Sequence, residues 1–165
     1  MSKAIAVLTL ACALVATAAA AKPRPLTTQD YIDIHQLNGR YALATDTGDG
    51  LGRAATFTPD GSFRGFGNNG PYEPIAGVAA RTTQNGNTGG RHFMANEVIT
   101  ATEEGADMTS YALILRPQNQ ERQPVVGIAC FYTDKLVRTR QGWRFKTRAV
   151  WCDSDPASPF KAKVP

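Results

Sequence analysis

The chain has 165 residues, which is enough for one domain with a hydrophobic core and too few for two domains of ordinary size. Its formal net charge is +4, and the charges are spread along the chain without a sharp basic patch, which argues against a nucleic-acid-binding protein. Two distant histidines and the two cysteines Cys130 and Cys152, without zinc spacing, make a poor metal site, and we expect neither a metal nor another cofactor.

Residues 1–21 have the pattern of a secretory signal peptide. Lys3 supplies a basic start, residues 4–15 are apolar, and residues 19–21 form an Ala-Ala-Ala cleavage site. The apolar run is too short to span a bilayer, so we expect a periplasmic or secreted protein that is free of the membrane after cleavage. A lipid-modified Cys12 in the membrane fraction is the alternative.

The rest of the chain predicts helices first and then a series of strands. Thr27 or Thr28 can cap a long helix that ends in "DTGDG", where Gly48 and Gly50 break it. The remaining predicted elements are a short helix over 51–57, a turn at 58–61, a strand over 62–67, a helix over 75–82, and strands over 91–102, 107–116, 124–139 and 142–152. Residues 153–165 read as a flexible C-terminal tail. This order indicates an α+β fold with an antiparallel meander.

The last two strands predict a disulfide in an exported chain. If residues 140–142 form the hairpin loop, Cys130 lies directly opposite Cys152, and Asp134 lies opposite Arg148. Two buried free thiols are the alternative. The basic residues on both sides of the hairpin loop alternate with apolar ones, which predicts the solvated face of a hairpin. They are Arg138, Arg140, Arg144, Lys146 and Arg148.

Several segments together resemble one family. They are "LNGRYALATDTGDGLGRAATFTPDGSF", "PIAGVAAR", "GGRHFMANEVIT", "SYALIL", "ACFYTDKLVR" and "GWRFKTRAV". In this order they resemble the SnoaL-like proteins of the nuclear transport factor 2-like superfamily, from about Thr28 to Cys152, which is nearly all of the domain expected over residues 22–152. The resemblance implies a cone, in which a curved antiparallel sheet wraps a long N-terminal helix and leaves one pocket. It also implies relatives such as polyketide cyclases, dehydratases and ketosteroid isomerase, and a homodimer.

By the same resemblance, Asp46 and His92 match an aspartate–histidine pair that abstracts a proton in some members. A carboxylate that holds one imidazole nitrogen leaves the other free to act as a base. The chain departs from scytalone dehydratase in two ways, since "SYALILRPQ" has no second histidine and Thr45 precedes Asp46, which argues against that dehydration. Asp46 could instead terminate the helix, and His92 could be a packing residue.

Strand alternation predicts the other pocket residues. It places Met94, Asn96 and Val98 on the face of His92, with Asn96 as a second polar group. Aromatic residues are expected to form the pocket wall or the core, and we expect contact with substrate from Tyr41, Phe57, Phe131 and Trp151. His35 is predicted to face solvent, and Arg138 is predicted to lie on the surface.

The sequence is therefore compatible with two functions. One is a cofactor-independent lyase or isomerase that acts on a small hydrophobic or cyclic molecule. The other is a binding module for such a molecule, or a dimeric scaffold. The distance between the Asp46 carboxylate and the His92 ring is the first observation that bears on the choice.

Overall fold

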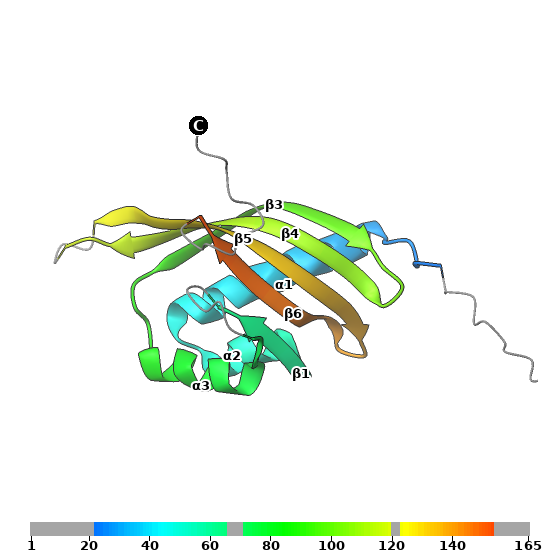
Figure 1. Cartoon of the computed structure of the whole chain (residues 1–165), viewed down its shortest axis with the longest axis horizontal. Coiled ribbons are helices and arrows are strands. Elements are labelled where there is room, and N and C mark those ends of the chain that lie inside the picture. Colours follow the sequence, from blue (N-terminus) through cyan, green and yellow to red (C-terminus); the bar gives the residue numbers. More distant parts are fainter. Residues whose placement is uncertain (1–21, 66–70, 120–122, 154–165) are drawn as a thin grey trace, which may run out of the picture.

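The computed structural model describes residues 22–65, 71–119 and 123–153. The chain order is α1 (Thr28–Thr47), α2 (Gly50–Ala55), β1 (Phe57–Arg64), β2 (Glu73–Pro74), α3 (Ile75–Asn85), β3 (Arg91–Ala101), β4 (Gly105–Pro117), β5 (Pro124–Thr139) and β6 (Gly142–Cys152) (Figure 1). The expected signal peptide and all of the expected tail but Asp153 lie outside the described residues. No helix in the described part of the chain is long and apolar enough to cross a membrane.

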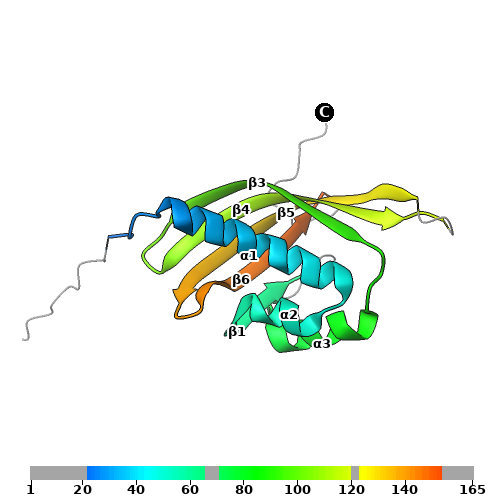
Figure 2. The same ribbon diagram turned by 180° about the vertical axis from the view of Figure 1, so that it is seen from behind.

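Helix α1 begins and ends at the residues that the sequence indicates. Thr27 and Asp30 form a capping box, in which each side chain accepts a hydrogen bond from the backbone of the other. Gly48 ends the helix in the left-handed region at φ 77°, where a residue with a Cβ is strained. Figure 2 shows α1 lying across the concave side of the sheet. The helix is thereby placed to contribute one face to the interior and one edge to β3.

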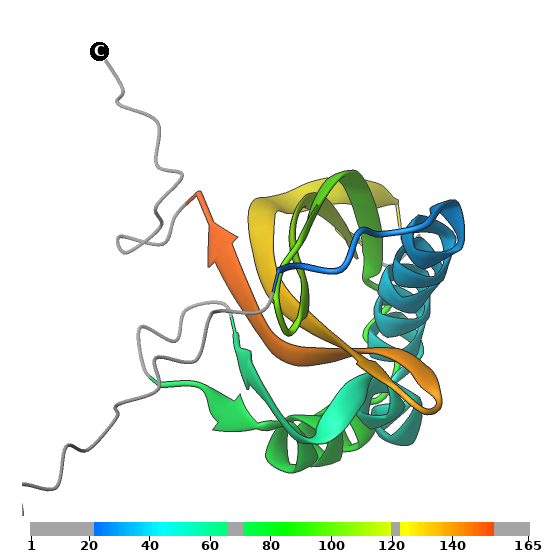
Figure 3. The ribbon, with the colours of Figure 1, turned by 90° about the vertical axis from the view of Figure 1, so that its right-hand side faces the viewer.

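The sheet has six strands in the order β2-β1-β6-β5-β4-β3. Strands β3 to β6 form the expected antiparallel meander, but β1 pairs with β6 in parallel, so the sheet is mixed. The view along the molecule shows the sheet curving around the interior, with α1 on its open side and α2 and α3 together near β1 (Figure 3). The α+β cone is confirmed, with this correction to the strand directions.

Aromatic side chains fill the interior. Tyr41 is 1% exposed and its ring contacts those of Phe57, Phe63, Tyr132 and Phe145, with centroids 5.9–6.4 Å apart. Burial of this cluster is the main force that holds α1 against the sheet.

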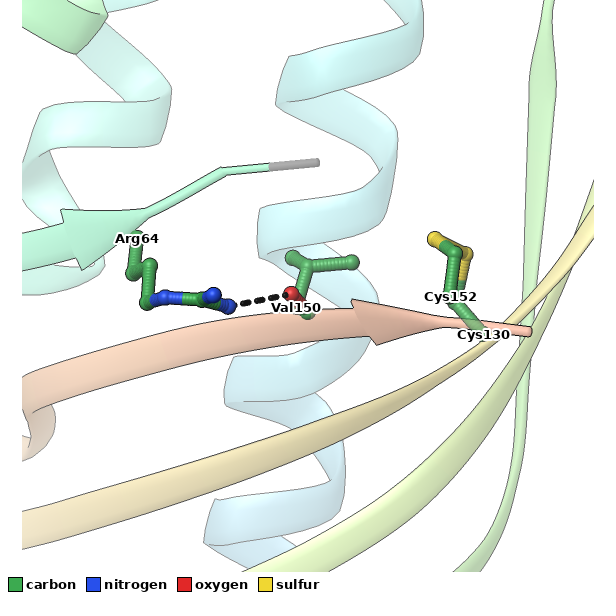
Figure 4. Close-up of a disulfide and its surroundings, with 4 residues drawn as sticks. All are labelled: Arg64, Cys130, Val150 and Cys152. Atoms are coloured by element: carbon green, nitrogen blue, oxygen red, sulfur yellow. Dashed lines mark hydrogen bonds between the residues drawn. A yellow bond between two sulfur atoms is a disulfide. The ribbon is translucent and has the colours of Figure 1, made fainter. Parts of the chain in front are cut away.

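The β5–β6 hairpin confirms the disulfide but corrects the turn. Cys130 pairs with Cys152 and the two are bridged (Figure 4). In the same view Arg64 of β1 donates a hydrogen bond to the carbonyl oxygen of Val150, 3.3 Å away. The turn has two residues instead of three, because Thr139 pairs with Gly142.

A β-bulge in β6 restores the predicted register. Leu136 pairs with Phe145 whereas Lys135 pairs with Thr147, so Lys146 has no partner in the ladder. One extra residue also reverses which side chains face the interior. Trp143 and Phe145 face inward before the bulge, and Arg148 faces inward after it. The prediction that Arg148 belongs to a solvated face is therefore wrong.

Candidate functional site

Helix α1 and the edge strand β3 bring Asp46 and His92 together. His92 Nδ1 lies 2.6 Å from Asp46 Oδ1, and the backbone N–H of His92 donates to Asp46 Oδ2 at 2.9 Å. Their side chains are 13% and 7% exposed. An ionised carboxylate only accepts, so this contact places the imidazole proton on Nδ1 and leaves Nε2 available in the neutral ring.

The pair lies in a groove of about 440 Å³ between α1 and β3. Its helical side consists of positions 35, 39, 42, 43 and 46, whose spacing of three and four residues makes one face of α1. Its other side consists of Arg91, His92, Phe93, Met94 and Glu97 of β3. The walls are mostly apolar in the middle and polar near the ends.

A β-bulge in β3 changes which residues face this groove. Ala95 pairs with Tyr111 and Val98 pairs with Thr109, so two residues of β3 stand opposite one of β4. Asn96 sits in the bulge at φ 55° and is exposed. The alternation predicted from His92 therefore fails beyond Ala95. Asn96 and Val98 point away from α1, and Glu97 takes the inward position.

Glu97 holds a second imidazole at the far end of the groove. Its Oε2 lies 3.0 Å from His35 Nδ1, and its Oε1 accepts a hydrogen bond from Asn38 Nδ2 at 2.6 Å. His35 is exposed as expected, at 67% of its side chain, whereas Glu97 is 12% exposed. The groove thus contains two imidazole–carboxylate pairs, and only one of them was visible in the sequence.

The second pair is anchored to a sealed ion pair in the interior. Asn38 Oδ1 accepts a hydrogen bond from Arg148 Nη2 at 2.7 Å. Arg148 also donates to both carboxylate oxygens of Asp134, from Nε at 2.7 Å and from Nη2 at 2.8 Å, and both side chains are 0% exposed. The guanidinium carbon lies 3.8 Å from the ring centroid of Phe145 and 4.2 Å from that of Tyr41.

Burial and charge act against each other in this ion pair. Burial acts to lower the pKa of Arg148, but the Asp134 carboxylate outweighs it and the pKa lies above its ordinary value. Burial raises the pKa of Asp134, and the guanidinium opposes that rise. Arginine keeps its proton in proteins, so the ion pair persists and Asn38 is held in one orientation.

Sequence reasoning could have found only part of this network. The hairpin register already set Asp134 opposite Arg148, which was a signal for an ion pair. Glu97 and Asn38 carried no such signal. Glu97 faces inward only because of the bulge in β3, and the partner of Asn38 on α1 is set by how the helix packs on the sheet.

The four aromatic residues expected to contact substrate do not share one surface. Tyr41 and Phe57 are core residues, exposed by 1% and 4%. Phe131 and Trp151 lie on the outer face of the sheet. There Phe131 stacks edge-on against Tyr111, and Trp151 donates a hydrogen bond to Thr133 at 2.9 Å. None of the four borders the groove that contains His92.

Asp49 and Arg138 have structural partners outside the groove. Asp49 caps α2 by accepting a hydrogen bond from the backbone N–H of Gly52 at 2.8 Å. Arg138 forms an ion pair with Asp30 and covers the Trp143 ring. No group of three metal-ligating side chains occurs in the ranges that the structure describes.

A larger surface groove, of about 690 Å³, lies on the other side of α1. It is bordered by α2 and the β5–β6 turn, and Leu43 separates it from the histidine groove. It contains neither histidine, so we place the candidate site in the smaller groove.

Comparison with known families agrees with this fold. The sequence model of the SnoaL-like domain matches residues 27–149. The chain belongs to the SnoaL-like family. No curated protein matches this SnoaL-like chain.

Solved structures with the same architecture are numerous. The SnoaL-like chain is 28% identical to ActVI-ORFA from Streptomyces coelicolor, over 76% of its own length and 98% of that chain, with a TM-score of 0.67. It is 24% identical to a cystatin-like-fold protein of unknown function from Nostoc punctiforme, over 82% and 98% of the two chains, with a TM-score of 0.66. A Catenulispora acidiphila protein solved in complex with S-DNPA is also 24% identical, over 77% and 96%, with a TM-score of 0.65.

Proposed function

We propose that this SnoaL-like protein is a cofactor-independent lyase or isomerase that acts on a small hydrophobic or cyclic molecule. His92 is the base, and Asp46 orients it. The observation that carries the proposal is the 2.6 Å contact between Asp46 and His92 Nδ1 inside a groove with apolar walls.

The contacts of Asp46 suit it to an orienting role. One carboxylate oxygen binds the imidazole and the other binds the backbone N–H of the same residue, so both the ring and its strand are held. The free Nε2 of a neutral ring can then remove a proton next to a carbonyl or a leaving group. Ala42 and Met94 would border an apolar substrate and help to exclude water from the reacting atoms.

The family and one neighbour support a small molecule as the ligand. A protein from Catenulispora acidiphila with the same fold was solved in complex with S-DNPA, and this chain is similar to ActVI-ORFA over 98% of the length of ActVI-ORFA. By that likeness, a small and largely apolar molecule is the substrate class we propose.

Export and dimerisation complete the proposal. The pattern of residues 1–21 supports secretion or release into the periplasm, with cleavage near Ala21. Exposed apolar side chains on the outer face of the sheet support a homodimer through that face; Phe93 is 58%, Tyr111 47% and Leu113 46% exposed. N-terminal sequencing of the exported protein and light scattering test the two statements.

A non-catalytic binding module is the second candidate. It is favoured by the bond between the His92 backbone and Asp46, because this bond ties β3 to α1 whether or not chemistry occurs. In that case the pair serves to hold the groove in shape.

Two variants separate these candidates. Co-purifying small molecules are first identified by mass spectrometry and then used as substrates or ligands. For an enzyme, His92→Ala abolishes turnover with little change in melting temperature, since Asp46 keeps its bond to the backbone N–H. Asp46→Asn loses a large part of the rate because the ring is no longer held. If ligand is bound without turnover, and if His92→Ala leaves its affinity intact and lowers stability by about 1–3 kcal/mol, the enzyme proposal fails.

A further inference from the structure

Gly39 lies in the middle of α1 without a structural reason to be glycine. Glycine is among the poorest helix formers, and a helix interior normally excludes it. Its φ is not positive, and a Cβ built at this position would meet no atom within 4 Å. Gly50 is different, because a Cβ there would lie 2.2 Å from the carbonyl oxygen of Ala79. Packing demands a glycine at Gly50 but not at Gly39.

The empty space above Gly39 is the histidine groove. Gly39 is exposed and borders that groove, four residues after His35 and seven before Asp46. A side chain at this position would extend between the two imidazoles, over the middle of the groove. The missing side chain therefore keeps a continuous path open from one histidine to the other.

The two imidazoles at the ends of this path are held in the same way. Each uses Nδ1 to contact a carboxylate, Asp46 for His92 and Glu97 for His35. No described residue bonds to either Nε2. Glu97 is itself held by Asn38, which is bound to the sealed Arg148. His35 is therefore better oriented than an exposed surface histidine usually is.

The length of the groove determines what could reach both ends. Positions 35 and 46 are separated by about 16 Å along the helix, at 1.5 Å per residue. His35 occupies the first of these positions and His92 is bound to Asp46 at the second, so a molecule that contacts both imidazoles must span most of that length.

We propose that the groove binds an elongated, largely apolar molecule that lies across Gly39 and carries a hydrogen-bonding group at each end. One end is held at His92 and the other at His35, and Gly39 determines the length of molecule that is accepted. This inference rests on the proposed function, since it places the reacting end at His92.

The test is a substitution that fills the groove with a larger side chain and is designed to leave the fold unchanged. Gly39→Leu introduces a side chain into open groove space, and Gly77→Leu is the matched control. Gly77 is an exposed glycine of α3, where a Cβ would meet only Arg81 Nη1 at 3.9 Å, and it is not a groove residue. Both variants replace a helical glycine by a better helix former, so both are expected to melt at the wild-type temperature or above it.

Binding is measured by calorimetry with diethylstilbestrol, an apolar rod with a phenol at each end, and with its dimethyl ether, which has lost both donors. We expect the wild type and Gly77→Leu to bind the diphenol alike, and Gly39→Leu to bind it about tenfold or more weakly. His35→Ala is expected to lower the affinity for the diphenol and to leave the affinity for the ether, which is already lower, unchanged.

Three results would overturn the inference. They are no binding of the diphenol to the wild type, unchanged affinity in a folded Gly39→Leu variant, and equal affinity for the diphenol and the ether. Gly39→Ala provides a second, smaller obstruction if the leucine variant does not fold. If Gly39→Leu loses binding while His92→Ala keeps the wild-type turnover, the groove ligand is supported and the proposed base is wrong. If His92→Ala loses turnover while folded Gly39→Leu keeps the wild-type affinity, the proposed base is supported and the groove ligand is wrong.

Discussion

The interior of the cone and the groove beside it each contain an aspartate bound to a nitrogen base, in opposite surroundings. In the interior, Arg148 and Asp134 are both 0% exposed and aromatic rings cover the guanidinium. In the groove, the side chains of His92 and Asp46 are 13% and 7% exposed. A ligand can reach the second pair and not the first.

Because the two ion pairs differ in exposure, we expect them to have different roles. A sealed pair with several partners holds its neighbours in position, and here it orients Asn38 and, through it, Glu97. A partly exposed histidine can exchange protons with a substrate, which a fully buried arginine cannot do. Substitutions in the interior should therefore change stability, and those in the groove should change ligand binding or rate.

The largest expected effect comes from breaking the sealed pair. Arg148→Ala leaves the Asp134 carboxylate buried without a partner, and we expect a loss of about 3–5 kcal/mol in the free energy of unfolding. Urea denaturation measures it, with exposed Arg140→Ala as a control that should stay within about 0.5 kcal/mol of wild type. A small loss in Arg148→Ala would mean that the interior is not sealed.

Removing the disulfide is expected to have the next largest effect, and it tests how firmly β5 and β6 are held together around Asp134 and Arg148. Cys130 and Cys152 join the same two strands that carry Asp134 and Arg148. We expect Cys130→Ala with Cys152→Ala to lower stability by about 2 kcal/mol, below the roughly 3 kcal/mol typical of bridges, because the hairpin already aligns the strands. Alkylation of both thiols in the oxidised wild-type protein would contradict the bridge.

The smallest effect concerns a pair with one buried and one exposed partner, Asp30 with Arg138. Burial acts to raise the pKa of Asp30, but hydrogen bonds from Thr27 and Trp143, and from Arg138, outweigh it and place the pKa well below its ordinary 3.8. A folded pKa below the unfolded one stabilises the protein above pH 3.8, and this contribution is lost as the pH falls further.

Asp30→Asn should therefore lower stability at neutral pH and flatten its decline on the acid side of pH 3.8. Melting curves recorded across the acid range measure this change. Asp33→Asn, on the exposed side of the same helix turn, is the control. An acid decline of the same steepness in Asp30→Asn and wild type would show that another carboxyl group is responsible.

The sequence by itself determined most of the elements and the pairing of the last two strands, although β1 occupies Phe57–Arg64, where a turn at 58–61 and a strand over 62–67 were predicted. The capping residues of α1, the four long strands and the opposition of Cys130 to Cys152 all follow from local patterns, since caps, alternation and turns are read over a few residues. The resemblance that selected Asp46 and His92 also chose two residues that the fold places in contact.

Tertiary structure alone decided which polar residues face inward beyond the two bulges. One extra residue in β3 turns Glu97 toward α1, and one in β6 turns Arg148 into the core. The side-chain pattern of a strand has a period of two, so a single added residue reverses every later position. Bulges form where a curved sheet must bend around its helix, and that curvature belongs to the whole fold and is absent from either strand alone.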